Sequence, residues 1–189
     1  MGRNAAERFQ ARSRSREMLP MGQTRYLTCA ETAKLIRKAL AADFPGQKFH
    51  VRSSVYSGGA SIRVVWRNGP TVAQVRQVTD TYAAGGFDGM IDLAYNVTSW
   101  LTPDGRAGVA HSPGTTASRG SVPEFSQPIP SGAEIVHFGA DYVFAERELD
   151  EWIIARARQH VADGYAGLTD YEAERIVRQT VEALAFTAV

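Results

Sequence analysis

The sequence holds little that would tie the chain to redox chemistry, a membrane or an export route. Its single cysteine, Cys29, cannot form a disulfide within the chain, which suits a reducing compartment. No apolar run approaches the roughly 20 residues of a membrane span, and the basic first segment lacks the apolar core of a secretion signal. We therefore expect a cytoplasmic protein that does not enter a membrane.

Motifs for metals, cofactors and phosphate groups are also missing from the sequence. The histidines do not show the H-x-H or H-E-x-x-H spacing of metal sites; they are His50, His111, His137 and His160. The glycine pair Gly58-Gly59 lies between two predicted strands, and no G-K-S/T motif accompanies it. The sequence therefore predicts neither a metal site nor a cofactor, and it favours a protein without enzymatic activity.

Three side chains could still take part in catalysis. Cys29 is expected in the first turn of a helix, where the helix dipole favours a thiolate nucleophile, although a partly buried structural cysteine is commoner there. Asp88 and Asp92 flank the start of a predicted strand and could pair for acid–base catalysis. A turn aspartate and a solvent-facing aspartate explain the two residues equally well. We assign no residue a catalytic role.

Two amphipathic helices are predicted between residues 24 and 101. Thr28 with Glu31 forms a capping box at the start of the first helix, and apolar residues follow at helical spacing. Thr71 with Gln74 caps the second helix, which carries its own apolar stripe. Each helix therefore has one face to bury.

Three strands are predicted in the same region. Residues 48–56 and 61–67 alternate between apolar and polar, and Ser57-Gly58-Gly59 between them is typical of a tight hairpin. Residues 90–100 alternate again. The sequence thus predicts an α+β fold, in which a two-layer α-β-β-α-β unit places both helices on one face of an antiparallel sheet. Trp66 is expected between the layers.

A long segment rich in proline, glycine and serine spans residues 102–133. We expect a loop, either as a meander whose short pieces around Val109 and Val122 lie along the core, or as a mobile arm that binds a partner. Residues 134–144 then return as a strand, with a bend or bulge predicted at Gly139-Ala140.

The last third of the chain is predicted to form an αα-hairpin, because two apolar stripes at helical spacing flank a short turn. This hairpin either packs on the α+β unit or protrudes, so that it forms a homodimer or docks on a partner. The length of 189 residues and the 44% hydrophobic content suit one main core. We expect a basic flexible arm (1–23), an α+β domain (24–150) and a helical hairpin packed on that domain (151–189).

Several short motifs carry a resemblance to a known family: Tyr26-Leu27-Thr28, Tyr56-Ser57-Gly58-Gly59, Gly69-Pro70-Thr71, Phe87-Asp88-Gly89-Met90-Ile91-Asp92, Phe138-Gly139-Ala140-Asp141-Tyr142-Val143-Phe144 and Arg147. Through these motifs the chain resembles a large polyvalent protein-associated domain, the type numbered 29. Such domains occur within very large phage and plasmid proteins and as small stand-alone proteins of mobile elements. The resemblance implies a role in protecting incoming DNA or supporting its establishment in a bacterial host. It supplies no catalytic residues.

One face of the predicted hairpin is a candidate nucleic-acid site. If the apolar residues of the two strands face the helices, the opposite face carries His50, Arg52, Tyr56, Arg63 and Arg67. Arginine interleaved with an aromatic residue on an open sheet suits nucleic-acid backbones and stacked bases. An ordinary solvated face has the same composition, and Asp92 and Asn96 of the third predicted strand would dilute its charge.

The first 25 residues add a second cluster of positive charge, which includes Arg12, Arg14 and Arg16. As a disordered arm this segment could grip phosphates or an acidic partner, and a solvated tail has the same composition.

Three functions follow from these observations. The first is a binding protein of a phage or plasmid that contacts a host or mobile-element protein, such as a defence or replication component. The second is an accessory protein that binds single-stranded DNA or RNA through the basic sheet face and the arm. The third is an enzyme without a recognisable motif.

Overall fold

A computed structural model describes residues 24–115, 122–165 and 167–183. It combines helices with three sheets, which confirms the α+β class. The predicted arm at residues 1–23 lies outside the described residues. The elements are, in order, β1 (Arg25–Tyr26), α2 (Cys29–Asp43), β2 (Phe49–Tyr56), β3 (Gly59–Arg67), α3 (Val72–Thr79), η1 (Asp80–Tyr82), β4 (Gly85–Asp88), β5 (Leu93–Asn96), β6 (Thr98–Leu101), β7 (Ala107–Ser112), β8 (Phe125–Ser126), β9 (Glu134–His137), β10 (Tyr142–Glu148), α4 (Glu151–Gly164) and α5 (Asp170–Ala183).

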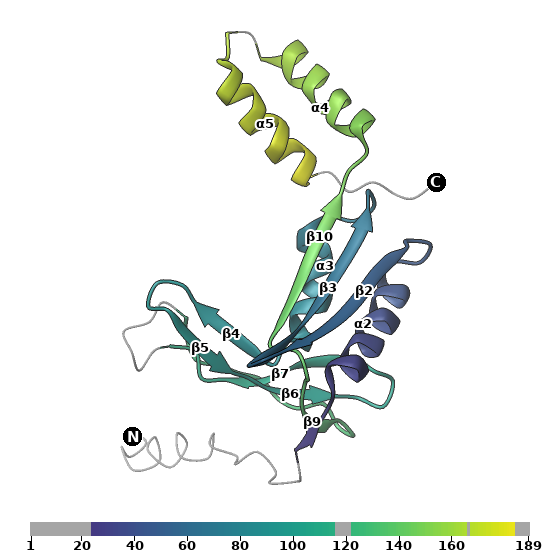
Figure 1. Cartoon of the computed structure of the whole chain (residues 1–189), viewed down its shortest axis with the longest axis vertical. Helices are drawn as coiled ribbons and strands as arrows, with labels where there is room; N and C mark the ends of the chain where they lie inside the picture. Colours follow the sequence, from purple (N-terminus) through teal and green to yellow (C-terminus); the bar gives the residue numbers. More distant parts are fainter. Residues whose placement is uncertain (1–23, 116–121, 166, 184–189) are drawn as a thin grey trace, which may run out of the picture.

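The strands β2 and β3 form the predicted antiparallel hairpin, and Gly58 supplies its positive φ of 89°. The third strand of their sheet differs from the prediction. It is β10, which runs parallel to β3 and gives the strand order β10-β3-β2. The expected all-antiparallel sheet is therefore wrong, and the sheet is mixed (Figure 1).

The predicted strand at residues 90–100 is in fact two strands in other sheets. Residues 90–92 form a turn that ends with Asp92 at a φ of 53°, and β5 then pairs back onto β4 as a hairpin. Val97 separates β5 from β6, which pairs instead with β7 and β9. Burial alternates in β6, as predicted, but not in β5, and the alternation carried no information about the partners of either strand.

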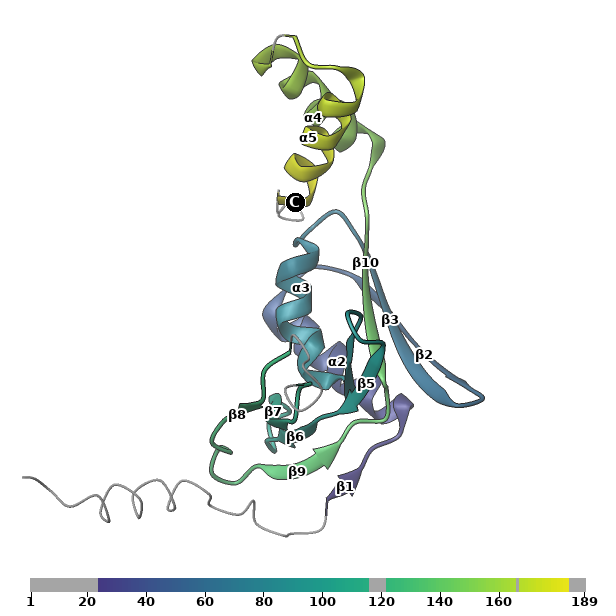
Figure 2. The same ribbon diagram turned by 90° about the vertical axis from the view of Figure 1, so that its left-hand side faces the viewer.

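Both helices cover one side of the three-stranded sheet (Figure 2). The capping boxes of Thr28 with Glu31 and of Thr71 with Gln74 are both formed, as predicted. Trp66 is only 1% exposed, and its indole Nε1 donates to the Pro70 carbonyl at 2.9 Å, which confirms its place between the layers.

Val55 lies on the helix-facing side of β2 with Val51, as the alternation predicts, but it is not buried there as expected. Its side chain is 76% exposed, whereas Val51 on the same strand is buried. The first turn of α2 contacts β2 at Ser54, the residue before Val55, because the Cys29 sulfur lies 4.0 Å from the Ser54 carbonyl. The hairpin end therefore extends past the helix that would cover it.

A five-stranded sheet, in the order β1-β9-β6-β7-β8, takes two short strands from the segment that was expected to be a loop. Residues 107–112 form β7, which pairs with β6, and Phe125–Ser126 form β8. The expected meander is confirmed for the piece around Val109, which is part of a strand of this sheet, whereas Val122 is half-buried outside any strand. Residues 116–121 lie outside the described part of the chain.

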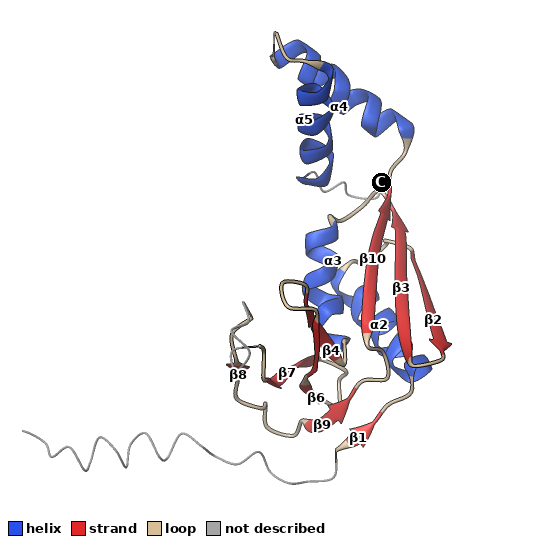
Figure 3. Ribbon diagram, turned by 60° about the vertical axis from the view of Figure 1, so that its left-hand side comes forward, coloured by secondary structure: helices blue, strands red, loops and turns tan. Residues whose placement is uncertain are grey.

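The predicted bend at Gly139-Ala140 is where the chain passes from one sheet to the other (Figure 3). The Gly139 amide donates to Thr32 Oγ1 at 3.0 Å, and the Ala140 carbonyl accepts from the Ala84 amide at 2.8 Å. A Cβ atom at Gly139 would collide with the backbone between Leu27 and Cys29. Glycine is therefore required here because two backbone segments approach closely.

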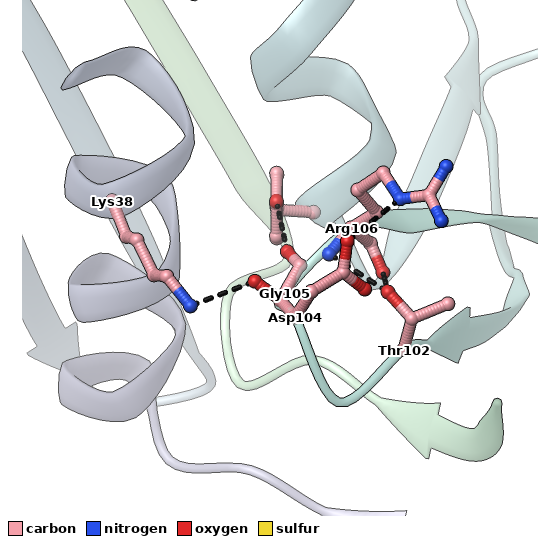
Figure 4. A network of polar contacts seen from close by, with 6 residues as sticks. Lys38, Thr102, Asp104, Gly105 and Arg106 are labelled. Atoms are coloured by element: carbon pink, nitrogen blue, oxygen red, sulfur yellow. Dashed lines mark hydrogen bonds and ion pairs between the residues drawn. The ribbon is translucent and has the colours of Figure 1, made fainter. Parts of the chain in front are cut away.

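The turn between β6 and β7 is fastened to α2 by a polar network (Figure 4). Lys38 Nζ donates to the Asp104 carbonyl at 2.7 Å, and Arg106 pairs with the Asp104 carboxylate at 2.9 Å. The Tyr82 hydroxyl donates to the Gly105 carbonyl at 3.0 Å. These contacts hold the five-stranded sheet against the helical layer.

The helices α4 and α5 form the predicted αα-hairpin around a small core of their own: Ile153, Ala157, Val161, Val177 and Val181. The hairpin stands beyond the ends of β3 and β10 (Figures 1 and 3). Arg147 of β10 links the two parts, because its guanidinium donates to the carbonyls of Asn68, Gly69 and Val181. Closer packing of the hairpin and its use in a homodimer stay predictions. None of the described helices is both long and apolar enough to cross a membrane.

Candidate functional site

The side of the β10-β3-β2 sheet that faces away from α2 and α3 is the candidate site, and we call it the open face (Figure 2). Within the described part of the chain, no helix or strand is drawn over it. Alternation along each strand defines its residues. They are His50, Arg52, Ser54 and Tyr56 of β2, Ser61, Arg63, Val65 and Arg67 of β3, and Tyr142, Phe144, Glu146 and Glu148 of β10.

The structure brings together the four sheet residues that the sequence nominated. Arg52 and Arg63 lie directly opposite each other across the hairpin, and Arg67 follows farther along β3. Tyr56 lies at the hairpin end, and all four side chains are exposed. Arg12, Arg14 and Arg16 of the proposed arm lie outside the described residues.

The strand β10 adds two aromatic residues that sequence reasoning did not place on this face. Tyr142 lies beside Ser61, and Phe144 lies beside Arg63. Their ring centroids are 6.2 Å apart with planes tilted by 27°, and the side chains are 37% and 46% exposed. Two large rings are thus stacked on each other and remain partly exposed on this face.

The same strand and the start of α4 add negative charge. Arg63 Nε lies 3.1 Å from Glu146 Oε1, and Arg67 Nε lies 2.5 Å from Asp150 Oδ1. The Asn68 side chain donates to Asp150 at 2.8 Å, and this hydrogen bond is the main reason that the Asp150 pKa is lowered. The face was expected to be basic, but its arginines are largely matched by carboxylates.

These charges are unevenly distributed over the open face. One half of the open face, which we call the hairpin half, lies next to the turn between β2 and β3. It holds Tyr142, Phe144, Tyr56, Arg52 and Arg63, and Arg52 makes no ion pair with any described residue. The other half holds Arg67 together with the side chains of Glu146 and Glu148. Apart from the Glu146 carboxylate that pairs with Arg63, the hairpin half is therefore aromatic and cationic, and the other half is mixed in charge.

Cys29 is not placed for nucleophilic catalysis. The side chain is 5% exposed, and its sulfur lies 3.5 Å from the Ser61 carbonyl. Burial raises the pKa of the Cys29 thiol, so the neutral form is favoured in spite of the helix start. The structural alternative weighed for this cysteine fits the geometry.

The two candidate acid–base residues have separate environments. Asp88 is buried, and its carboxylate accepts from the Met90 amide at 2.9 Å and from Thr115 Oγ1 at 2.7 Å. Asp92 is exposed in the turn that follows. Asp88 thus shapes the β4–β5 turn and ties it to Thr115. Among the described residues, no group of three or more histidine, cysteine or acidic side chains is arranged to hold a metal ion.

A groove of about 360 Å³ lies between the helical hairpin and the start of α3, and its lining includes Val72, Arg147, Leu149 and Val181. Its rim carries both Arg178 and Glu182. The Arg147 guanidinium donates to three backbone carbonyls, so it serves the structure of the groove rather than a ligand. The open face remains the better candidate.

The region that contains the open face matches a known protein family. The family described as large polyvalent protein associated domain 29 matches residues 27–150, which is 124 of the 189 residues. The chain belongs to this family. The match includes α2, β2, β3, α3 and β10 and ends where α4 begins, so the resemblance inferred from the sequence motifs is confirmed. Neither the curated proteins nor the solved structures contain a match to the chain.

Proposed function

We propose that the protein is an accessory protein of a mobile genetic element, such as a phage or a plasmid. In this role it binds a host defence or replication protein and thereby protects incoming DNA. Membership of the polyvalent protein associated family supports the association with a mobile element.

The open face is the observation that supports action by binding. It combines exposed aromatic rings with arginines, and these residue types are enriched where proteins bind one another. By contrast, the side chains best suited to catalysis, Cys29 and Asp88, are buried, and both are hydrogen-bonded. A broad surface of this composition fits a macromolecular partner better than a small substrate.

A transfer assay tests this function. Unmodified plasmid or phage DNA is introduced into bacteria that carry a restriction system, with and without the protein, and established clones or plaques are counted. We expect the protein to raise the count, and Phe144→Ala to return it to the level without the protein. Phe125→Ala is the matched control, because Phe125 is an equally exposed phenylalanine on β8, away from the open face. An unchanged count with the parent protein contradicts the proposal.

A second function, the binding of nucleic acid, is supported by a specific observation. Tyr142 and Phe144 extend the Arg52–Arg63 pair into a surface that has both flat rings and cations. This combination is typical of proteins that bind single strands.

A further inference from the structure

The rings of Tyr142 and Phe144 meet a geometric requirement for base stacking. Both belong to one strand, two residues apart, so they project to the same side of the sheet. Their rings stack on each other, and both side chains keep more than a third of their surface exposed. An unpaired base has an apolar face of similar size, which is why aromatic side chains on open sheets receive bases of single strands.

The cations beside the rings are positioned for the phosphates. Arg63 of β3 lies beside Phe144 of β10, and Arg52 of β2 lies on the other side of Arg63. Among the described residues only Arg63 of these two is in an ion pair, with Glu146, and both of its members are at least half exposed. Such an exposed pair is weak, so it does not hold the Arg63 guanidinium away from a phosphate.

The carboxylates limit where a polynucleotide can lie. Glu146 and Glu148 occupy the next outward positions of β10, away from the hairpin, and would repel phosphates. None of the outward-facing residues of the hairpin half is acidic, and the carboxylate of Asp141, just before Tyr142, accepts from the Ala60 amide at 2.8 Å. Charge complementarity therefore favours that half, over Tyr142, Phe144, Arg63 and Arg52.

We propose that Tyr142 and Phe144 form a stacking platform for consecutive bases of a single-stranded polynucleotide, with Arg63 and Arg52 contacting its phosphates. This inference rests on the second proposed function, the binding of nucleic acid, and names the site of binding. Recognition depends on ring faces and charge, so it is tolerant of sequence and requires unpaired bases.

Fluorescence anisotropy with the full chain tests the platform. The probes are labelled oligo-dT and oligo-U of about 12 nucleotides, a length within the usual range for such sites, and a DNA duplex of the same length, all at about 50 mM salt, where phosphate contacts are strong. We expect both single strands to bind more tightly than the duplex. The tighter of the two identifies DNA or RNA as the natural source.

Matched variants separate stacking from folding and from general apolar contact. Phe144→Leu and Tyr142→Leu should each weaken single-strand binding by at least about fivefold, because stacking on one ring contributes at least that much. Phe144→Tyr keeps a ring and should bind within about twofold of the parent, a change of under 0.5 kcal/mol. Phe125→Leu removes an equally exposed ring from another sheet and should leave binding unchanged. Equal thermal unfolding of all variants shows that each is folded.

Several results would overturn the inference: no binding of either single strand by the parent, equal binding of the duplex, or equal losses for Phe144→Leu and Phe125→Leu. These outcomes differ from failure of the protein-binding function. If Phe144→Ala abolishes protection while the parent binds no oligonucleotide, the stacking platform is wrong and protein binding stands. If oligonucleotides bind at the platform but no protection is seen, the platform stands and the protective role is wrong.

Discussion

The two faces of the β10-β3-β2 sheet are built from the same strands and serve opposite purposes. On β3, the inward-facing Ile62, Val64 and Trp66 are at most 1% exposed, whereas Arg63 and Arg67 between them point outward. Burial of apolar surface stabilises the fold through the inner face. The outer face keeps aromatic and charged side chains in water, where they add little to stability and are available for a partner. Stability therefore comes from the inner face, and the proposed binding is placed on the outer face.

The largest expected effect is on the inner face. Trp66→Ala should lower the free energy of unfolding by about 3–5 kcal/mol, because it removes a buried ring system and leaves a cavity. Chemical denaturation measures this loss. Val65→Ala, on the next residue and the outer face, is the matched control and should cost well under half as much. A loss below about 1 kcal/mol for Trp66→Ala would mean that the two faces have been assigned the wrong way round.

The next effect is a pH dependence of the same buried layer. Burial, reinforced by the negative charges of Asp43 and Asp104, raises the pKa of Tyr82 to about 12 from its ordinary value of 10.0. The unfolded chain therefore loses this proton first, and the stabilisation is complete below pH 10 and is lost as the pH rises towards 12. A shift of this size corresponds to about 2–3 kcal/mol.

Denaturation of the parent and of Tyr82→Phe between about pH 8 and pH 12 isolates this contribution. The difference in unfolding free energy between the two proteins should shrink or reverse as the pH rises, because phenylalanine has no proton to lose. Parallel curves over this range would show that the Tyr82 hydroxyl ionises normally in the folded protein.

A smaller effect is expected from the cap of the helix that covers the inner face. Thr28 Oγ1 accepts from the Glu31 amide at 3.2 Å and donates to the Glu31 carboxylate at 2.7 Å, and Thr28→Ala removes both bonds. The loss should be about 1 kcal/mol. Thr24→Ala, at an exposed position outside any helix, should change stability by less than about 0.5 kcal/mol. Equal losses at both threonines would contradict the capping role.

The smallest effects on stability are expected on the open face. Arg52→Gln and Phe144→Leu should each change the unfolding free energy by less than about 0.5 kcal/mol, because both side chains are exposed. Thermal unfolding with each single variant measures this. A loss above about 1.5 kcal/mol from either change would show that the face contributes to folding, and the division between the two faces would fail.

The elements whose signals are local could be predicted from the sequence. Capping boxes need only residues three apart, so Thr28 with Glu31 and Thr71 with Gln74 located both helices. The glycine turn and the alternation around it located the β2–β3 hairpin, and the alternation placed Trp66 in the core. The Gly139-Ala140 pair also located the bend, where the backbone at Gly139 lies in close contact with the backbone between Leu27 and Cys29.

The partners of the strands could not be predicted, since alternation is the same whichever strand lies alongside. The strand β10 pairs with β3 only after the chain has passed through the whole five-stranded sheet. The candidate site was incomplete for the same reason. Arg52 and Arg63 come from one hairpin and were found together, whereas Phe144 and Glu146 reach the face through a long-range pairing.

Photo-crosslinking inside bacteria tests the central claim, that the open face is where the protein meets its partner. A photoreactive phenylalanine analogue replaces Phe144 in one protein and Phe125 in another, since the two native side chains are 46% and 49% exposed. We expect a discrete covalent adduct, with a protein or a nucleic acid, from position 144, and its loss when Arg52 and Tyr142 are also replaced. No adduct at position 144, or the same adducts from position 125, would contradict the assignment of binding to the open face.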